Sequence, residues 1–310
     1  MQNKISWADI EMKTDLNCLP CILNQMIRAI NKTIKDEKNK EIAFREVLYS
    51  LYEADWNKSP MIVAYNAFKK VKEISNVEDP FYEDKREQNK RALEIYPKLK
   101  EIVANSDDSL FTAVKLAIVG NVIDLGPGHT FEINQAVEEC FKKDLKINHF
   151  DMFKKLIEDA QDILYIADNA GEIVFDKVLL EQLKEKKITF VVRAQAIAND
   201  ALYEDAIEAG IDKLAKIEKL DLLGKTPGDG KTLEDMQEVF QIYDVVISKG
   251  QANFELFDEY TGNTFFLLRV KCQPIATVLN SEIGDLIPVS YTHLRAHETR
   301  HDLVCRLLLE

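Results

Sequence analysis

The second half of the chain alternates short apolar runs with helical patterns, and this alternation constrains the fold more than any other feature. The apolar runs are Ile163–Ala167, Ile188–Val192, Val245–Ile247 and Thr264–Val270. Runs of this kind are typical of strands buried on both faces of a parallel sheet. Helical patterns cover residues 173–186, 200–209, 235–243 and 254–259. Because strands that alternate with helices indicate right-handed crossovers, we predict an α/β fold with a Rossmann-like, mostly parallel sheet.

The first half of the chain is predicted to be all helical. Residues 60–73 carry apolar side chains close to a 3.6-residue period, and residues 80–104 are amphipathic with an interruption near Pro97. Residues 110–122 are strongly apolar. We therefore predict an N-terminal all-helical domain over residues 1–150. A Rossmann-like α/β domain that binds metal and phosphate is predicted over residues 151–288.

The charge of the chain argues against two classes of partner. The chain has 310 residues, with 40 Lys and Arg against 53 Asp and Glu, for a net charge of −13. Nucleic acids and anionic membrane surfaces favour positively charged proteins, so we expect neither as a partner. No run approaches the roughly 18 apolar residues of a membrane span, and the first residues lack the apolar segment of a signal peptide. We predict a cytoplasmic protein.

Residues 289–310 differ from the rest of the chain in composition. They contain three of the five histidines and use arginine without lysine, although the rest of the protein is rich in lysine. The segment also resembles the translated adapter read-through found at the ends of some assembled sequences. We predict that it is not native, so its histidines are not counted as metal ligands.

Polar residues follow three of the predicted strands. Asp168 and Asn169 follow the first strand, Asp200 follows the second, and Lys249 and Gly250 follow the third. Ligands of open parallel sheets bind beyond the carboxyl ends of the strands, so these side chains should meet at one edge. Carboxylate and amide oxygens suit a hard divalent cation such as Mg²⁺ or Mn²⁺.

The same edge also offers groups that suit a phosphate. Gly171 would let the backbone approach a ligand, and the helix after it would present free N–H groups to an anion. Lys249 would supply a positive charge, and Gly250 would keep the space beside it open. A metal, a helix N-terminus and a lysine at one point indicate phosphate hydrolysis or phosphoryl transfer. The chain contains no G-x-G-x-x-G, P-loop or G-x-S-x-G motif, which argues against the enzyme classes that use them.

Five motifs occur in an order that resembles a known family. They are Cys18–Cys21, Gly120–Asp124, Asp168–Glu172, Asn199–Asp200 and Lys249–Glu255. The set is similar to the family catalogued as domain of unknown function 89, the damage-control phosphatases. It is most similar to the branch of that family that carries a CxxC motif and occurs in archaea and bacteria.

The resemblance implies a divalent-metal-dependent phosphatase that hydrolyses small phosphorylated metabolites. Implied substrates are sugar phosphates, or damaged or surplus cofactor precursors such as phosphopantetheine derivatives. The implied cofactor is Mn²⁺, Mg²⁺, Co²⁺ or Ni²⁺. The metal ligands would be Asp168, Asn169 and Asp200, with Asp205 as a weaker candidate for the third position.

The remaining implied roles concern the reaction and the substrate. Asp168, Glu172 and Lys249 would be catalytic, with Asp168 or Glu172 orienting the attacking water. A covalent aspartyl-phosphate remains an alternative. The predicted substrate or phosphate contacts are Asn121, Asp124, Gly171, Lys249, Gly250, Asn253 and Glu255.

The cysteines form a separate candidate site. The number of cysteines is odd, at five, and the chain lacks a signal peptide, and both observations argue against a disulfide framework. Cys18 and Cys21 could form a metal or redox pair, and Cys272 could approach them in space. The alternative is that these are ordinary half-buried thiols between the two domains.

Two other functions are compatible with the predicted fold. A Rossmann-like sheet with acidic residues at its strand ends can bind S-adenosylmethionine, which would make the protein a carboxyl methyltransferase. The chain could also bind a phosphorylated ligand without catalysis. Chelator-sensitive phosphate release would distinguish the phosphatase from both.

Overall fold

A computed structural model describes residues 12–120, 145–146, 149–222, 230–260 and 262–290 of the chain. The described helices are α1 (Cys18–Thr33), α2 (Glu37–Tyr52), α3 (Pro60–Ser75), α4 (Tyr82–Ala104), α5 (Ser109–Gly120), α7 (Phe150–Asp159), α8 (Glu172–Gln182), α9 (Tyr203–Ala209), α10 (Leu233–Ile242), α11 (Gly250–Phe257) and α12 (Gln273–Val278). The described strands are β1 (Asp162–Ile166), β2 (Lys187–Arg193), β3 (Lys216–Asp221), β4 (Lys231–Thr232), β5 (Val245–Lys249), β6 (Thr264–Arg269) and β7 (Leu286–Ser290). A 3-10 turn, η2 (Ile211–Lys213), follows α9.

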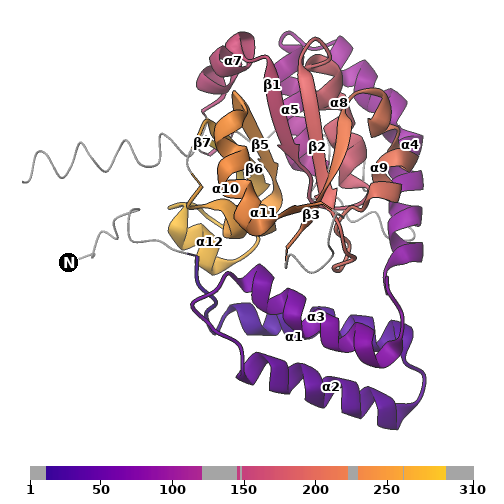
Figure 1. Cartoon of the computed structure of the whole chain (residues 1–310). Helices are drawn as coiled ribbons and strands as arrows, with labels where there is room; N and C mark the ends of the chain where they lie inside the picture. The colour runs from indigo at the N-terminus through magenta and orange to yellow at the C-terminus, as the bar shows by residue number, and fades with distance from the viewer. Residues whose placement is uncertain (1–11, 121–144, 147–148, 223–229, 261, 291–310) are drawn as a thin grey trace, which may run out of the picture.

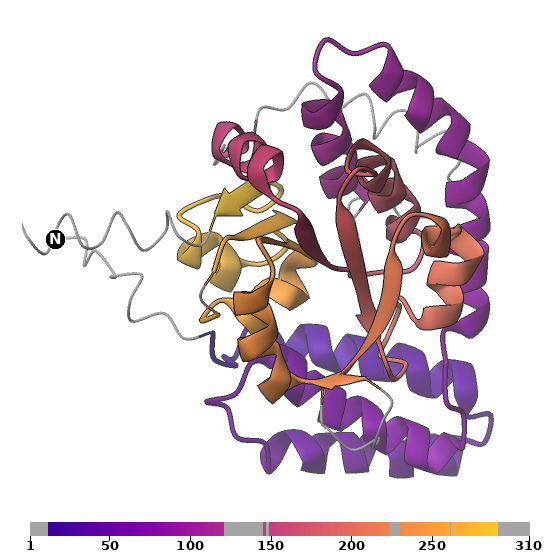
Figure 2. The same ribbon diagram turned by 45° about the horizontal axis from the view of Figure 1, so that its top comes forward.

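The centre of the molecule is a twisted sheet in the order β4-β3-β2-β1-β5-β6-β7. All neighbouring strands pair in parallel except β6 and β7, which are antiparallel. Helices cover both faces of the sheet (Figures 1 and 2). The α/β, mostly parallel fold predicted from the sequence is therefore confirmed.

Side chains of the central strands alternate between two hydrophobic cores, as the pleat requires. In β1, Ile163 and Tyr165 belong to the core shared with α4, α5, α7 and α8. Leu164 and Ile166 belong to the opposite core, shared with α10, α11 and α12. Burial on both faces explains why the strand sequences are continuously apolar instead of alternating.

Helices α4 and α5 pack on the sheet, although they lie before residue 150. Leu99 of α4 and nine consecutive residues of α5, from Thr112 to Gly120, are buried. Gly120 lies so close to α8 that a Cβ atom there would stand 2.8 Å from Cβ of Phe175. These two helices thus share a core with the α/β part, and the division of the chain at residue 150 stays a prediction.

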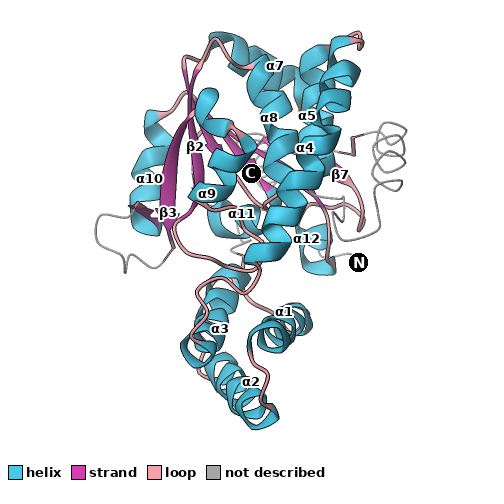
Figure 3. Ribbon diagram, turned by 90° about the vertical axis from the view of Figure 1, so that its right-hand side faces the viewer, coloured by secondary structure: helices cyan, strands magenta, loops and turns pink. Residues whose placement is uncertain are grey.

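Helices α1, α2 and α3 form a smaller unit with its own hydrophobic cluster, which includes Met26, Val47 and Phe68. Figure 3 shows this unit at one end of the molecule, below the sheet and its covering helices. Helix α3 touches the sheet part as well, because Met61 joins the core that contains α11. The charge of Asp221, at the carboxyl end of β3, contributes after burial to the raised pKa of Tyr65. The helical unit therefore lies at the carboxyl ends of the strands.

The C-terminal end of the described chain includes part of the segment that was predicted to be non-native. Strand β7 includes Val289 and Ser290, the first two residues of the segment predicted to be non-native, and they pair with Phe266 and Phe265. Residues 291–310 lie outside the described residues.

Within the described part of the chain, no helix is long and apolar enough to cross a bilayer.

Candidate active site

The strand order brings the turns after β1 and β5 side by side. The chain moves outward from β1 through β2, β3 and β4, and then returns to place β5 on the other side of β1. A crevice forms beyond the carboxyl ends where the direction of winding reverses in this way. Asp168 follows β1 and Gly250 follows β5 at this point. The predicted convergence of strand ends is therefore present in the structure.

The turn after β1 is joined to the segment before α9. The Ala170 N–H donates to the Asn199 carbonyl at 2.9 Å, and the Ala201 N–H donates to the Asp168 carbonyl at 2.8 Å. Asn169 and Asp200 form an isolated antiparallel bridge between the two segments. These backbone bonds bring all three predicted metal ligands together.

Arg193 is a site residue that the sequence analysis did not single out. Its guanidinium is buried and donates from Nε to Asp200 Oδ2 and from Nη2 to Asn253 Oδ1, both at 2.7 Å. Asn253 in turn donates to the Ala167 and Lys249 carbonyls at 2.8 and 2.7 Å. Asn253 thus ties β1 to β5 in this structure, which differs from the predicted contact with substrate. An arginine at the end of a strand was the only sequence signal for this role.

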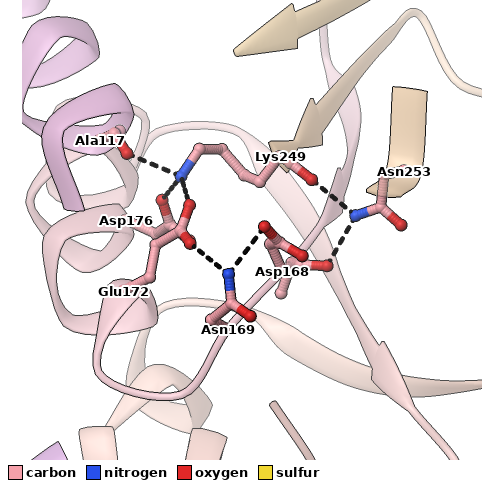
Figure 4. A network of polar contacts seen from close by, with 8 residues as sticks. Ala117, Asp168, Asn169, Glu172, Asp176, Lys249 and Asn253 are labelled. Carbon is pink, nitrogen blue, oxygen red and sulfur yellow. Dashed lines mark hydrogen bonds and ion pairs between the residues drawn. The ribbon is translucent and has the colours of Figure 1, made fainter. Parts of the chain in front are cut away.

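Lys249 is fully buried and its ammonium group is surrounded by protein oxygens (Figure 4). It donates to Glu172 Oε1 at 2.7 Å, to the Ala117 carbonyl at 2.8 Å and to Asp176 Oδ1. An ammonium group has three donors, so all of them are used. The predicted contact of Lys249 with phosphate would require one of these bonds to break. In this structure Lys249 instead orients Glu172.

Glu172 and Asp168 are also joined to each other through an amide. Asn169 Nδ2 donates to Asp168 Oδ2 at 2.8 Å and to Glu172 Oε2 at 3.0 Å. The amide nitrogen of Asn169 therefore faces the carboxylates, and its carbonyl oxygen Oδ1 points the other way (Figure 4). Because Nδ2 is the atom that faces Asp168, Asn169 Oδ1 would share a metal with Asp168 after the amide turns over.

The site contains more buried acids than buried bases. Among the described residues of the site, four carboxylates are at most 5% exposed and two cations are buried beside them. The carboxylates belong to Asp168, Glu172, Asp176 and Asp200, and the cations to Arg193 and Lys249. Such an excess is costly because charge in a low-dielectric interior is poorly solvated.

Burial is the main cause of the shifted pKa values of the site's acids. Burial raises the pKa of Asp168, and the charges of Glu172 and Asp200 raise it further. Burial likewise raises the pKa values of Asp176 and Asp200. Burial opposes the charged form of Lys249, but the two carboxylates beside it outweigh burial and raise its pKa. A divalent cation at Asp168 and Asp200 would favour their charged forms and so oppose the effect of burial on their pKa values.

The residues present therefore suit a hard divalent cation. Two carboxylates and an amide oxygen are the donors that Mg²⁺ or Mn²⁺ prefers, and three protein ligands leave positions for water and substrate. In the part of the chain that the structure describes, no group of three or more His, Cys, Asp or Glu side chains is arranged as a metal site. The candidate site consequently depends on Asn169 as well as on the two aspartates.

The two glycines of the site have positive φ angles, which favour glycine. Gly171 has φ 76° and Gly250 has φ 78°. A Cβ atom at Gly250 would lie 1.9 Å from Asp168 Oδ2, so no larger residue fits there without moving the aspartate. The Gly171 N–H, predicted to face a phosphate, donates to Asn89 Oδ1 at 2.7 Å instead.

Glu255 lies with the cysteines. Its charge contributes to the raised pKa values of Cys18, Cys21 and Cys272, after the larger effect of burial. Gln251 Nε2 connects Glu255 Oε1 at 3.0 Å with Cys272 Sγ at 3.1 Å. All three thiols are free. The structure therefore places Glu255 beside the predicted thiol site, and its predicted contact with substrate or phosphate stays a prediction.

Three predicted site residues remain to be placed, namely Asn121, Asp124 and Asp205. Asn121 and Asp124 lie outside the described residues. Asp205 accepts from Lys85 Nζ at 3.1 Å, Asn89 Nδ2 at 3.2 Å and the Leu202 N–H at 2.9 Å. Because these donors already surround Asp205, Asp200 is the better candidate for the third ligand.

The fold and the site define an α/β protein with a cluster of buried carboxylates at the switch point of its sheet. Residues 14–287 match the sequence profile of the damage-control phosphatase ARMT1-like domain. The chain belongs to this family, which confirms the resemblance found in the sequence.

Individual relatives match over nearly their whole length. The chain is 34% identical over 292 residues to "Damage-control phosphatase" from Archaeoglobus fulgidus, covering 89% of this chain and 98% of the relative. It is 32% identical over 288 residues to "Damage-control phosphatase PH1575" from Pyrococcus horikoshii, covering 89% and 97%. The crystal structure of that DUF89 family protein superimposes with a TM-score of 0.81 at 30% identity, covering 90% of this chain and 99% of the other.

Proposed function

We propose that the protein is a divalent-metal-dependent phosphatase that hydrolyses small phosphate monoesters. The observation that carries the proposal is the buried excess of carboxylates over cations at the switch point of the sheet. The printed names of the relatives from Archaeoglobus fulgidus and Pyrococcus horikoshii support phosphatase chemistry. Sugar phosphates and damaged or surplus cofactor precursors, such as phosphopantetheine derivatives, are the proposed substrates.

Asp168, Asn169 Oδ1 and Asp200 would hold the metal. When bound there, Mg²⁺, Mn²⁺, Co²⁺ or Ni²⁺ supplies charge neutralisation at a phosphoryl oxygen and lowers the pKa of a bound water. Arg193 keeps Asp200 in place through the 2.7 Å bond to Oδ2. Gly250 leaves the space that Asp168 occupies.

Glu172 is the proposed residue that orients the attacking water. Its two oxygens are fixed by Lys249 at 2.7 Å and Asn169 at 3.0 Å. Fixing both oxygens lowers the reorganisation needed for in-line attack, because the base is already positioned. Lys249 acts here through Glu172, and Asp176 balances the charge of Lys249 from the other side.

The test uses the purified full chain and a panel of sugar phosphates, phosphopantetheine derivatives and a generic aryl phosphate. Phosphate release is measured with Mg²⁺, Mn²⁺, Co²⁺ or Ni²⁺, each with and without chelator. We expect release that needs the metal and stops with chelator. Methyl transfer from S-adenosylmethionine without phosphate release would support a methyltransferase instead. The absence of both activities would support a protein that only binds phosphorylated ligands.

A further inference from the structure

A buried polar network outside the proposed metal ligands joins α4 to α9. Lys85 and Asn89 lie one turn apart on α4 and are 1% and 0% exposed. Lys85 Nζ pairs with Asp79 Oδ2 at 2.7 Å and with Asp205 Oδ2 at 3.1 Å. Asn89 Nδ2 donates to Asp205 Oδ1 and to Glu208 Oε2, both at 3.2 Å. The residues of this α4–α9 network are far apart in sequence and meet only in the fold.

The network fixes which way the Asn89 amide faces. Its nitrogen points to the carboxylates of Asp205 and Glu208, so its oxygen must point away from them. That oxygen accepts the Gly171 N–H at 2.7 Å. Gly171 is the residue before α8 and has φ 76°, a positive backbone angle that favours glycine. The network therefore ends in the turn that carries Asp168 and Asn169.

We propose that Asn89 is a positioning residue for the metal-binding turn. Its oxygen satisfies a buried N–H in the middle of a turn whose backbone direction sets where Asp168 and Asn169 point. Asp205 and Lys85 act one step further out, by keeping the Asn89 amide from turning over. The inference rests on the proposed function for the identity of the ligand, a divalent cation. The inference gives α4 a part in the site, although none of the proposed metal ligands lies on α4.

The first test removes the Asn89 amide. In Asn89→Ala, we expect the Mn²⁺ dissociation constant to rise about 10- to 100-fold, as for other residues that orient metal ligands. In the protein without metal, the peptide that contains Gly171 should exchange its amide hydrogens faster. Tyr96→Phe is the matched control, because it removes the 2.6 Å bond from α4 to Glu181 of α8, two turns away from Asn89. It should leave both measurements unchanged.

The second test exchanges the two partners. Both variants are made in a Glu208→Gln background, because Asn89 Nδ2 also donates to Glu208. In that background, Asn89→Asp alone keeps an acceptor for the Gly171 N–H but sets a carboxylate against Asp205, so it should bind Mn²⁺ weakly. The exchanged pair Asn89→Asp/Asp205→Asn in the same background restores a donor opposite an acceptor and keeps the net charge of that background. We expect it to recover most of the Mn²⁺ affinity and the slow exchange at Gly171. A role limited to filling space would not produce this recovery.

The outcomes separate the inference from the proposed function. Asn89→Ala that binds Mn²⁺ within twofold of the wild type, with unchanged exchange at Gly171, would overturn the positioning role. An exchanged pair no better than Asn89→Asp alone would also contradict it. A wild-type protein that neither binds Mn²⁺ nor releases phosphate would overturn the proposed function, and the proposed role toward a metal with it.

Discussion

Lys249 shows how single residues are balanced in the buried site. Burial disfavours its charge, and the neighbouring carboxylates of Glu172 and Asp176 compensate for this. Removing one partner of a buried ion pair leaves the other uncompensated, which costs about 3–5 kcal/mol. We therefore expect Lys249→Met to lose about that much unfolding free energy in chemical denaturation.

The matched variant removes a partner together with the lysine. Lys249→Met/Asp176→Leu should recover part of the lost stability, because one buried carboxylate disappears with the cation. A double variant less stable than Lys249→Met would show that the pair is not coupled in this way.

Gly250 sets the position of Asp168 through the space it leaves. Gly250→Ala would place a methyl group where Asp168 Oδ2 lies, and we expect Mn²⁺ binding to weaken about 10- to 100-fold. Gly210→Ala is the control, since Gly210 has a similar φ of 73° but the nearest atom to a Cβ there would be Lys177 Nζ, the end of a long side chain, 3.2 Å away. Isothermal titration of both variants checks the difference. Equal effects would mean that backbone strain, and not Asp168, is responsible.

Because the pKa of Glu255 is raised, we expect the free energy of unfolding to depend on pH. Burial raises its pKa to about 7 from an ordinary 4.5, and its neighbours include three thiols whose pKa values are raised above their ordinary 9.0. The folded protein thus holds this proton more tightly than the unfolded chain. The resulting stabilisation is present below about pH 4.5 and is lost as the pH rises to about 7.

Glu255→Gln, which stays neutral, isolates this effect. At pH 8 we expect it to be more stable than the wild type by about 1–3 kcal/mol, and near pH 4 the difference should almost vanish. Urea denaturation at both pH values measures it. A difference that does not change with pH would contradict the assignment.

At the scale of elements, the sequence predicted β1, β2, β5 and β6 better than the three outer strands β3, β4 and β7. β1, β2, β5 and β6 are continuously apolar and were expected. β3 reads as a polar segment because Lys216, Glu218 and Lys219 lie in it, and β4 has only two residues. β7 contains Pro288, which is tolerated because β7 is at an edge of the sheet. β3 and β4 are partly exposed, so an apolar pattern does not reveal them, whereas β7 is buried but its apolar run is interrupted by Pro288.

Because α1, α2 and α3 have their own hydrophobic cluster, we expect this unit to unfold separately from the sheet when the cluster is weakened. Phe68 is 1% exposed in its separate cluster, and Phe68→Ala should cost this unit about 3–5 kcal/mol. Hydrogen exchange should then show lost protection in α1, α2 and α3 while β1 and β5 stay protected. Tyr52→Ala is the control, because Tyr52 is 80% exposed on α2. Equal loss of protection in the sheet would show that the unit is not separate.

At the scale of the whole molecule, the site is assembled from distant segments. The bond from Lys249 to Ala117 spans 132 positions in the sequence, and that from Gly171 to Asn89 spans 82. Motifs identified Asp168, Asn169, Asp200 and Lys249, since each follows a strand. They could not identify Asn89, Asp176 or Arg193, whose roles depend on partners that only the fold brings near. In this structure Lys249 bonds to Glu172 and Asn253 bonds to the Ala167 carbonyl, and the phosphate contacts predicted for both residues stay predictions.

The acidic character of the molecule agrees with a site that needs a cation. A protein of net charge −13 repels an anionic phosphate ester unless positive charge is concentrated where the ester binds. Lys249 and Arg193 are already paired with carboxylates, so a metal at Asp168 and Asp200 would add positive charge that these two cations do not offer to the ester. The central claim is thus that Asp168 and its neighbours bind the metal on which hydrolysis depends.

Mn²⁺-dependent phosphate release by Asp168→Asn tests this claim most directly. The substitution keeps the shape of the side chain and removes the charge that would bind the metal. We predict that release falls about a hundredfold or more and that Mn²⁺ binding is lost, while Asp107→Asn, at an exposed aspartate, behaves like the wild type. Full Mn²⁺-dependent activity in Asp168→Asn, or wild-type activity that persists in excess chelator, would contradict the account.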